Sequence, residues 1–190
     1  MKPTLIFLAG CIIGIGVART PRFLTHIHLA LLSAKLRAEG RAEQRIHTEE
    51  TFEFTVAAPP GNVAALFGAE KERAWAPGWN PQFIWPSPAV DQEGMVFTVA
   101  HGDKNAVWIS TLFEPRTGHY QYVYVIPDVV ATVVALQWNP QGTYTHVTVK
   151  YDRTALNVAA NPIVQEMAKH DAKSGPEWQK QLGKYLGSAG

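Results

Sequence analysis

Residues 119–138 read HYQYVYVIPDVVATVVALQW, and this stretch decides the fold. Tyr120, Tyr122 and Tyr124 fall at every second position, as they do on one face of a β-strand. Pro127-Asp128 ends this strand, and the β-branched run from Val129 to Trp138 predicts another strand directly after it. The stretch therefore predicts two antiparallel neighbours joined by a tight turn.

Further short strands are predicted on both sides of this pair. We expect them at 46–56, 83–85, 95–101, 106–113 and 143–153, separated by turns that include Asn139–Gly142 and are rich in Gly, Pro, Asn and Asp. The first alternates strictly, with Phe52, Phe54 and Val56 on one face and polar side chains on the other. Turns at such regular spacing predict an antiparallel meander.

Two helical segments accompany the strands. A short one is expected at 60–69, where a proline opens it. The second, at about 155–187, carries an apolar stripe at helical spacing. Gly175-Pro176 must kink or break this segment, because proline removes a backbone hydrogen bond and clashes with the preceding turn. Asn161-Pro162 marks its expected first turn. The stripe comprises Leu156, Ala160, Ile163, Met167, Trp178, Leu182 and Tyr185.

The composition excludes several classes of function. The chain has 190 residues, 46% of them hydrophobic and 17% charged, which is ordinary for a globular protein with a core. A net charge of +1 gives no electrostatic reason to expect a nucleic-acid partner. The single cysteine, Cys11, excludes an intramolecular disulfide and thiolate-type zinc sites. We expect no metal and no cofactor.

The first 45 residues differ from the rest. Residues 1–18 contain Lys2 and the apolar run Leu5–Ala18, which predict a signal peptide or a membrane anchor. Leu8–Cys11 also resembles a lipoprotein processing site, and a helix buried in the domain is the remaining alternative. Residues 19–45 are expected to form a helical connector, and 46–187 the main domain. The protein is therefore expected to be membrane-associated or exported.

The order of strand, short helix, strand meander and C-terminal helix resembles the helix-grip superfamily. This superfamily includes Bet v 1-like allergens, START lipid-transfer domains and polyketide cyclases, and the chain most resembles uncharacterised bacterial polyketide cyclase/dehydrase-like proteins. The resemblance covers about residues 46–187, with Gly175-Pro176 as its main departure. It rests on Glu72–Pro81 (ERAWAPGWNP), Gly94–Phe97 (GMVF) and Val107-Trp108 ahead of the Glu114-Pro115 turn.

The resemblance implies an α+β fold, in which a curved antiparallel sheet of about seven strands wraps a long C-terminal helix around a hydrophobic cavity. It implies binding of a hydrophobic small molecule, lipid-like or polyketide-like. One alternative is an enzyme of cyclase or dehydratase type acting in the same cavity, which we favour less than binding alone. Another is an interaction protein with a filled core, because a fold alone does not define a function.

Seven residues are the candidates for ligand binding: Trp75, Trp79, Phe97, His101, Trp108, Tyr122 and Tyr124. The two loop tryptophans could form a cavity wall or fill the core beneath their loop. The strand tyrosines could offer hydroxyl groups to a ligand or pack on the outer face, and the sequence leaves both open. With Asp103 two residues later, His101 could act as a general base, or both could be solvated in a turn.

Overall fold

The computed structural model of the protein describes residues 35, 40 and 44–188. Residues from Glu43 onward form one compact unit. The segment predicted as a signal peptide, anchor or lipoprotein site (1–18) and nearly all of the predicted connector (19–45) lie outside the described residues. In the described part of the chain, no helix is both long and apolar enough to cross a membrane.

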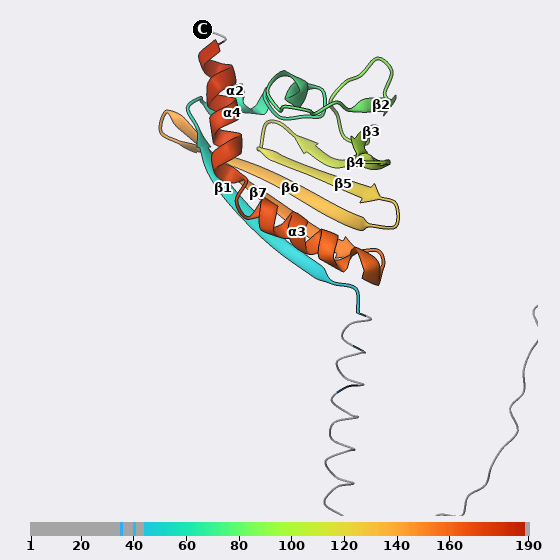
Figure 1. Ribbon diagram of the computed structural model, residues 1–190. Coiled ribbons are helices and arrows are strands. Elements are labelled where there is room, and N and C mark those ends of the chain that lie inside the picture. The colour runs from blue at the N-terminus through green and yellow to red at the C-terminus, as the bar shows by residue number, and fades with distance from the viewer. Residues whose placement is uncertain (1–34, 36–39, 41–43, 189–190) are drawn as a thin grey trace, which may run out of the picture. The chain divides into compact units, whose positions relative to one another are not determined.

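Seven antiparallel strands form one curved sheet in the order β1-β7-β6-β5-β4-β3-β2 (Figure 1). Strands β2 to β7 each lie beside the next in sequence, and β1 pairs with β7, so the predicted meander and fold class are confirmed. The strands are β1 (His47–Val56), β2 (Gln82–Trp85), β3 (Val96–His101), β4 (Lys104–Glu114), β5 (His119–Ile126), β6 (Val130–Gln141) and β7 (Tyr144–Ala155).

Strand β6 is longer than predicted. It continues through Asn139 and Pro140, where we expected a turn, and the chain reverses only at Gly142. Pairing with β5 stops at Gln137, so the end of β6 has a partner strand on one side only. Proline is tolerated at such an edge position because its missing N–H need not reach a neighbour.

The helices lie before β2 and after β7. The α-helix α2 (Pro60–Ala64) follows β1, and the 3₁₀ helix η1 (Lys71–Ala74) precedes β2. The helix expected at 60–69 is therefore shorter than predicted, because the chain turns away towards Gly68, which has a φ of 133°. After β7 come the 3₁₀ helix η2 (Val158–Ala160), α3 (Asn161–Asp171) and α4 (Gly175–Ser188). Helix α4 packs against β1, and α3 packs against β1 and β7 (Figure 1).

The predicted break in the C-terminal helix is confirmed. Helix α3 ends at Asp171, and α4 begins at Gly175, so Pro176 lies in a first turn, where it is tolerated. A Cβ at Gly175 would lie 2.6 Å from the carbonyl oxygen of Glu53. The absence of a side chain at this position therefore allows α4 to begin directly against β1.

The expected inward face of this segment is partly wrong. Ile163 is 50% exposed, whereas Val164 and Ala168 are buried. Leu156 precedes the helices, and Asn161 opens α3 as expected. The helical phase is thus set from Asn161 onward rather than from Leu156, which moves the buried stripe by one residue.

Candidate ligand cavity

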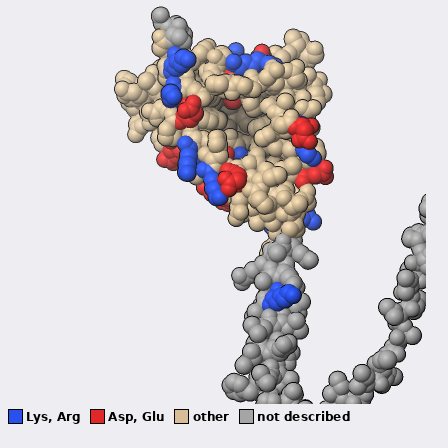
Figure 2. All heavy atoms as spheres, in the orientation of Figure 1, with Lys and Arg blue, Asp and Glu red and all other residues tan. Residues whose placement is uncertain are grey.

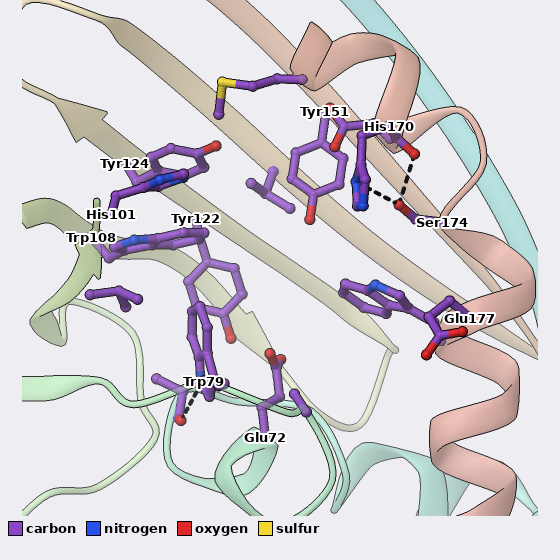
Figure 3. A pocket seen from close by; sticks show the side chains of 18 of the residues that line it. Glu72, Trp79, His101, Trp108, Tyr122, Tyr124, Tyr151, His170, Ser174 and Glu177 are labelled. Carbon is purple, nitrogen blue, oxygen red and sulfur yellow. Dashed lines mark hydrogen bonds between the residues drawn. The ribbon is translucent and has the colours of Figure 1, made fainter. Parts of the chain in front are cut away.

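A cavity of about 860 Å³ lies between the sheet, the loop that carries η1, and helices α3 and α4. Figure 2 shows the molecule hollowed on the face that these helices flank. All seven residues predicted to bind a ligand line this cavity. Figure 3 shows side chains from the sheet, the loop and the helices pointing into it.

The sheet supplies most of the apolar wall. Side chains at alternate positions of a strand share one face, and β5, β6 and β7 each contribute two residues at such positions. On β6 the buried Val134 and Leu136 line the cavity, and on β3 Phe97 and Val99 do so. The wall is thus built by the alternation that the sequence displays.

The tyrosines of β5 all face the inner side of the sheet. Tyr120, Tyr122 and Tyr124 are 1%, 5% and 3% exposed. Tyr122 and Tyr124 line the cavity, whereas Tyr120 lies outside it and donates to the carbonyl oxygen of Ala64 at 3.4 Å. The sequence left open whether these tyrosines face the cavity or the outside, and the structure places them on the inner face.

Trp75 and Trp79 belong both to the cavity wall and to the core. The indole N–H of Trp75 donates to the carbonyl oxygen of Leu66 at 2.6 Å, and that of Trp79 donates to the carbonyl oxygen of Ala69 at 2.8 Å. These bonds fix the loop around η1. Both indole N–H groups are already used, so the two tryptophans offer a ligand ring surface and no hydrogen bond.

Trp108 is the centre of an aromatic cluster at one end of the cavity. Its ring stacks on Tyr124 with the centroids 4.1 Å apart and on Phe97 at 5.7 Å, and it meets the edge of Trp79 at 5.4 Å. Such contacts hold rings in fixed relative orientations. This end of the cavity is therefore a set of positioned ring faces.

A buried ion pair joins the sheet to α3. Arg153 of β7 donates from Nε to Asp171 at 2.6 Å and from a terminal nitrogen at 2.9 Å. The other terminal nitrogen of Arg153 donates to the Tyr124 hydroxyl and to Thr132. The guanidinium also lies over the ring of Tyr151, 4.4 Å from its centroid. Both charges are thus paired within the protein.

Sequence reasoning missed this ion pair, although a signal for it was present. Val147, Val149 and Tyr151 alternate along β7, and the same alternation places Arg153 on their face, towards the core. A buried arginine requires a charged partner, because burying an unpaired charge is costly. The partner, Asp171, came from a helix that the sequence could not position.

Glu72 lies in the loop wall, close to the aromatic end. Burial of its carboxyl raises the pKa of Glu72 to about 8, although the backbone N–H of Gly68, at 3.4 Å, lowers it and Asp91 raises it further. The residue retains some exposure and lines the cavity. At pH 7 the carboxyl is predominantly protonated, so it can donate a hydrogen bond.

His101 lies at the exposed end of β3, on the edge of the cavity. Its backbone is paired with Lys104 of β4, but among the described residues its imidazole has no hydrogen bond to Asp103 or to another group. This geometry does not supply the orienting carboxylate that a histidine general base needs. His101 is therefore a rim residue rather than a positioned base.

His170 and Ser174 form a contact that sequence reasoning missed. Ser174 Oγ lies 3.3 Å from His170 Nδ1 and donates to the His170 carbonyl oxygen at 3.0 Å. The carbonyl of Ser174 accepts from the N–H of Trp178 in α4. The sequence contained a signal for this contact, because residues four positions apart are neighbours on a helix. The serine hydroxyl is occupied at the junction between α3 and α4.

One group of residues in the described part of the chain has metal-ligand spacing: His47, Glu49 and Asp152. His47 Nε2 lies 3.3 Å from Asp152 and 3.7 Å from Glu49. The second oxygen of Glu49 is paired with Lys150 at 2.9 Å. None of these residues lines the cavity, and their polar strand face is the surface that the sequence indicates.

The architecture is the helix-grip α+β fold of Bet v 1-like proteins. No protein-family model and no curated protein matches the sequence. Solved structures share the fold at low sequence identity. A likeness at such identity defines the fold and leaves the function open.

Three of these structures show the extent of the likeness. Norcoclaurine synthase from Thalictrum flavum superposes with a TM-score of 0.57 and 11% identity, over 75% of this chain and 95% of that one. CalU16 from Micromonospora echinospora gives 0.52 and 14%, over 76% and 84% of the two chains. Mll3558 from Rhizobium loti gives 0.50 and 19%, over 76% and 98%.

Proposed function

We propose that the protein binds a hydrophobic small molecule, lipid-like or polyketide-like, in the cavity between the sheet and the C-terminal helices. The cavity itself carries this proposal. Its volume of about 860 Å³ falls in the range of roughly 300–1,000 Å³ that is typical of small-molecule sites. A core filled by the protein's own side chains, the basis of the interaction-protein alternative, would not leave this space.

The character of the wall supports the same proposal. Aromatic and aliphatic side chains dominate it, so the main driving force would be removal of apolar surface from water, about 25 cal/mol per Å². The likeness to solved structures gives further support, because a norcoclaurine synthase with this fold is seen in complex with dopamine and hydroxybenzaldehyde.

Reducing the cavity tests this proposal. Val99→Trp with Val134→Phe places added volume in the wall, because both residues line the cavity. Thr98→Trp with Val133→Phe introduces the same two side chains one residue earlier, on the opposite face of the same strands. Native mass spectrometry of protein expressed in bacteria is expected to show a bound molecule in the wild type and the control, and not in the cavity variant.

The outcome that would overturn the proposal is equally defined. If the wild type carries no bound molecule and shows no heat of binding with 2-ethylnaphthalene in calorimetry, the cavity does not bind apolar ligands. Retention of the bound molecule by the cavity variant would place the binding site elsewhere.

A second candidate is cyclase- or dehydratase-type chemistry in the same cavity. The observation that favours it is a tyrosine with a polar partner on the cavity wall, since Tyr124 accepts a hydrogen bond from Arg153. A positioned phenol can move a proton. If so, the molecule recovered from Tyr124→Phe protein should differ from that in the wild type, for instance by one water. Identical molecules would argue for binding alone.

We also propose that residues 1–18 direct the protein to a membrane or out of the cell. The apolar run Leu5–Ala18 beside Lys2 supports this proposal. Fractionation of cells expressing the full chain, with the mass of the recovered protein, would test it. Recovery of the intact chain only in the cytosolic fraction would contradict it.

A further inference from the structure

Two buried polar atoms of side chains that line the cavity have no hydrogen-bond partner among the described residues. They are the hydroxyl oxygen of Tyr122 and the indole nitrogen of Trp108, and each is buried. Buried polar groups are nearly always hydrogen-bonded in native proteins, so each exception needs a reason. Both atoms belong to side chains that line the cavity, and their rings meet at 6.3 Å between centroids.

The carboxyl of Glu72 lies at the same end of the cavity. Figure 3 shows it and the Tyr122 hydroxyl pointing into the space beside Trp79. Burial raises the pKa of the Tyr122 hydroxyl well above its usual value, and the carboxyl of Glu72 raises it further. A protonated carboxyl, a phenol and an indole can each donate one hydrogen bond. This end of the cavity therefore presents donors.

Of the described residues that line the cavity, only Arg153 and Lys173 carry a permanent positive charge. Arg153 lines the cavity, but its charge is balanced by Asp171. Lys173 is exposed and contributes from the helix side, where Glu166 and Glu177 also line the cavity. An ionised ligand group placed among the donors would lose its hydration without gaining a counter-ion, which is costly.

From these contacts we propose that the cavity takes an uncharged aromatic ligand with a carbonyl oxygen, which accepts a hydrogen bond from the Tyr122 hydroxyl. This inference rests on the proposed binding function and specifies its ligand class. The stacked rings of Phe97, Trp108 and Tyr124 give the frame of the ligand an apolar aromatic contact, and the carbonyl oxygen satisfies the buried Tyr122 hydroxyl. A ligand of the same shape without the oxygen leaves the Tyr122 hydroxyl unpaired, which a site built in this way discriminates against.

Three compounds of nearly equal shape test this inference by calorimetry: 2-acetylnaphthalene, 2-ethylnaphthalene and 2-naphthoate. The wild type is expected to bind the ketone about tenfold more tightly than the hydrocarbon, the size of one good hydrogen bond. Naphthoate is expected to bind more weakly than the ketone, because its charge has no partner among the donors.

Variants connect the preference to the named hydroxyl. Tyr122→Phe is expected to reduce the advantage of the ketone several-fold and to leave the affinity for 2-ethylnaphthalene unchanged. Tyr144→Phe is the matched control, because Tyr144 is 49% exposed and does not line the cavity. If Tyr122→Phe does not fold, the ranking of the three compounds on the wild type decides alone.

The results separate this inference from the function on which it rests. Binding of the hydrocarbon as tightly as the ketone, or of naphthoate as tightly as either, overturns the ligand class and leaves the binding function in place. Absence of binding by both neutral compounds overturns the inference and the binding function together.

Discussion

Two groups of buried polar side chains line the same cavity and differ in how their hydrogen bonds are satisfied. In the ion-pair group (Arg153, Asp171, Tyr124 and Thr132), Arg153 donates to each of the other three side chains. In the donor group (Glu72, Trp108 and Tyr122), the Trp108 indole nitrogen and the Tyr122 hydroxyl have no hydrogen-bond partner in the described part of the chain. Satisfied polar groups stabilise a fold, whereas unsatisfied ones destabilise it. The first group therefore holds the helices on the sheet, and the second is free to meet a ligand.

Removing one partner of the ion pair should give the largest effect. Asp171→Ala leaves the charge of Arg153 buried and unpaired, which should lower the free energy of unfolding by about 3–5 kcal/mol. Urea denaturation monitored by circular dichroism measures this loss. Glu166→Ala, which removes an exposed pair with Lys169, should cost less than about 1 kcal/mol. Equal costs for the two variants would show that the buried pair holds the fold no more strongly than an exposed one.

Two tyrosines of β5, one from each group, allow a direct comparison of how much each hydroxyl contributes to stability. Tyr124→Phe removes a hydrogen bond to a charged group and should cost about 2 kcal/mol in the free energy of unfolding. Tyr122→Phe removes a hydroxyl that has no partner, so its cost should be close to zero or the change stabilising. The same denaturation measurement serves both variants. A cost for Tyr122→Phe as large as that for Tyr124→Phe would show that its hydroxyl is bonded within the protein.

The smallest effect should appear as a pH dependence in the donor group. Burial raises the pKa of Glu72 from 4.5 to about 8 in the folded state, opposed by the N–H of Gly68 and assisted by Asp91. The folded protein then holds the proton more tightly than the unfolded chain. The contribution of Glu72 to stability is therefore full below pH 4.5 and is lost as the pH rises through about 8.

Glu72→Gln should remove this dependence and stabilise the protein at pH 9 by about 1–2 kcal/mol, less than the full shift implies because Glu72 is partly exposed. Denaturation at pH 5, 7 and 9 measures it, with the exposed Glu93→Gln as control. A wild type whose stability changes with pH in the same way as the Glu72→Gln variant would contradict the raised pKa.

The sequence predicts the sheet well because its signals are local. Alternation along β1, β5 and β7 and the turns between strands are readable residue by residue. They place Tyr122 and Tyr124 on one face of a strand, but they do not tell which face of the sheet that is. The Arg153–Asp171 pair could not be predicted, since it joins a strand to a helix whose phase depends on Asn161 and on the close approach of Gly175 to β1.

The donor group was missed for a related reason. Glu72 stands among charged residues in the sequence (Lys71, Glu72, Arg73), where a solvated surface is the natural expectation. Only the folded loop shows that the middle side chain of the three lines the cavity. Likewise, Tyr122 and Trp108 lack hydrogen-bond partners among the described residues because no polar group from another part of the fold lies near enough. A local sequence pattern carries no information about such distant groups.

Four of the six tryptophans, Trp75, Trp79, Trp108 and Trp178, line the cavity. The protein thus contains its own optical reporter. Entry of a ligand replaces water beside these indoles and changes their emission, and an absorbing guest quenches it. Occupancy can be followed by light on the unlabelled chain, in whatever library of compounds is chosen for screening.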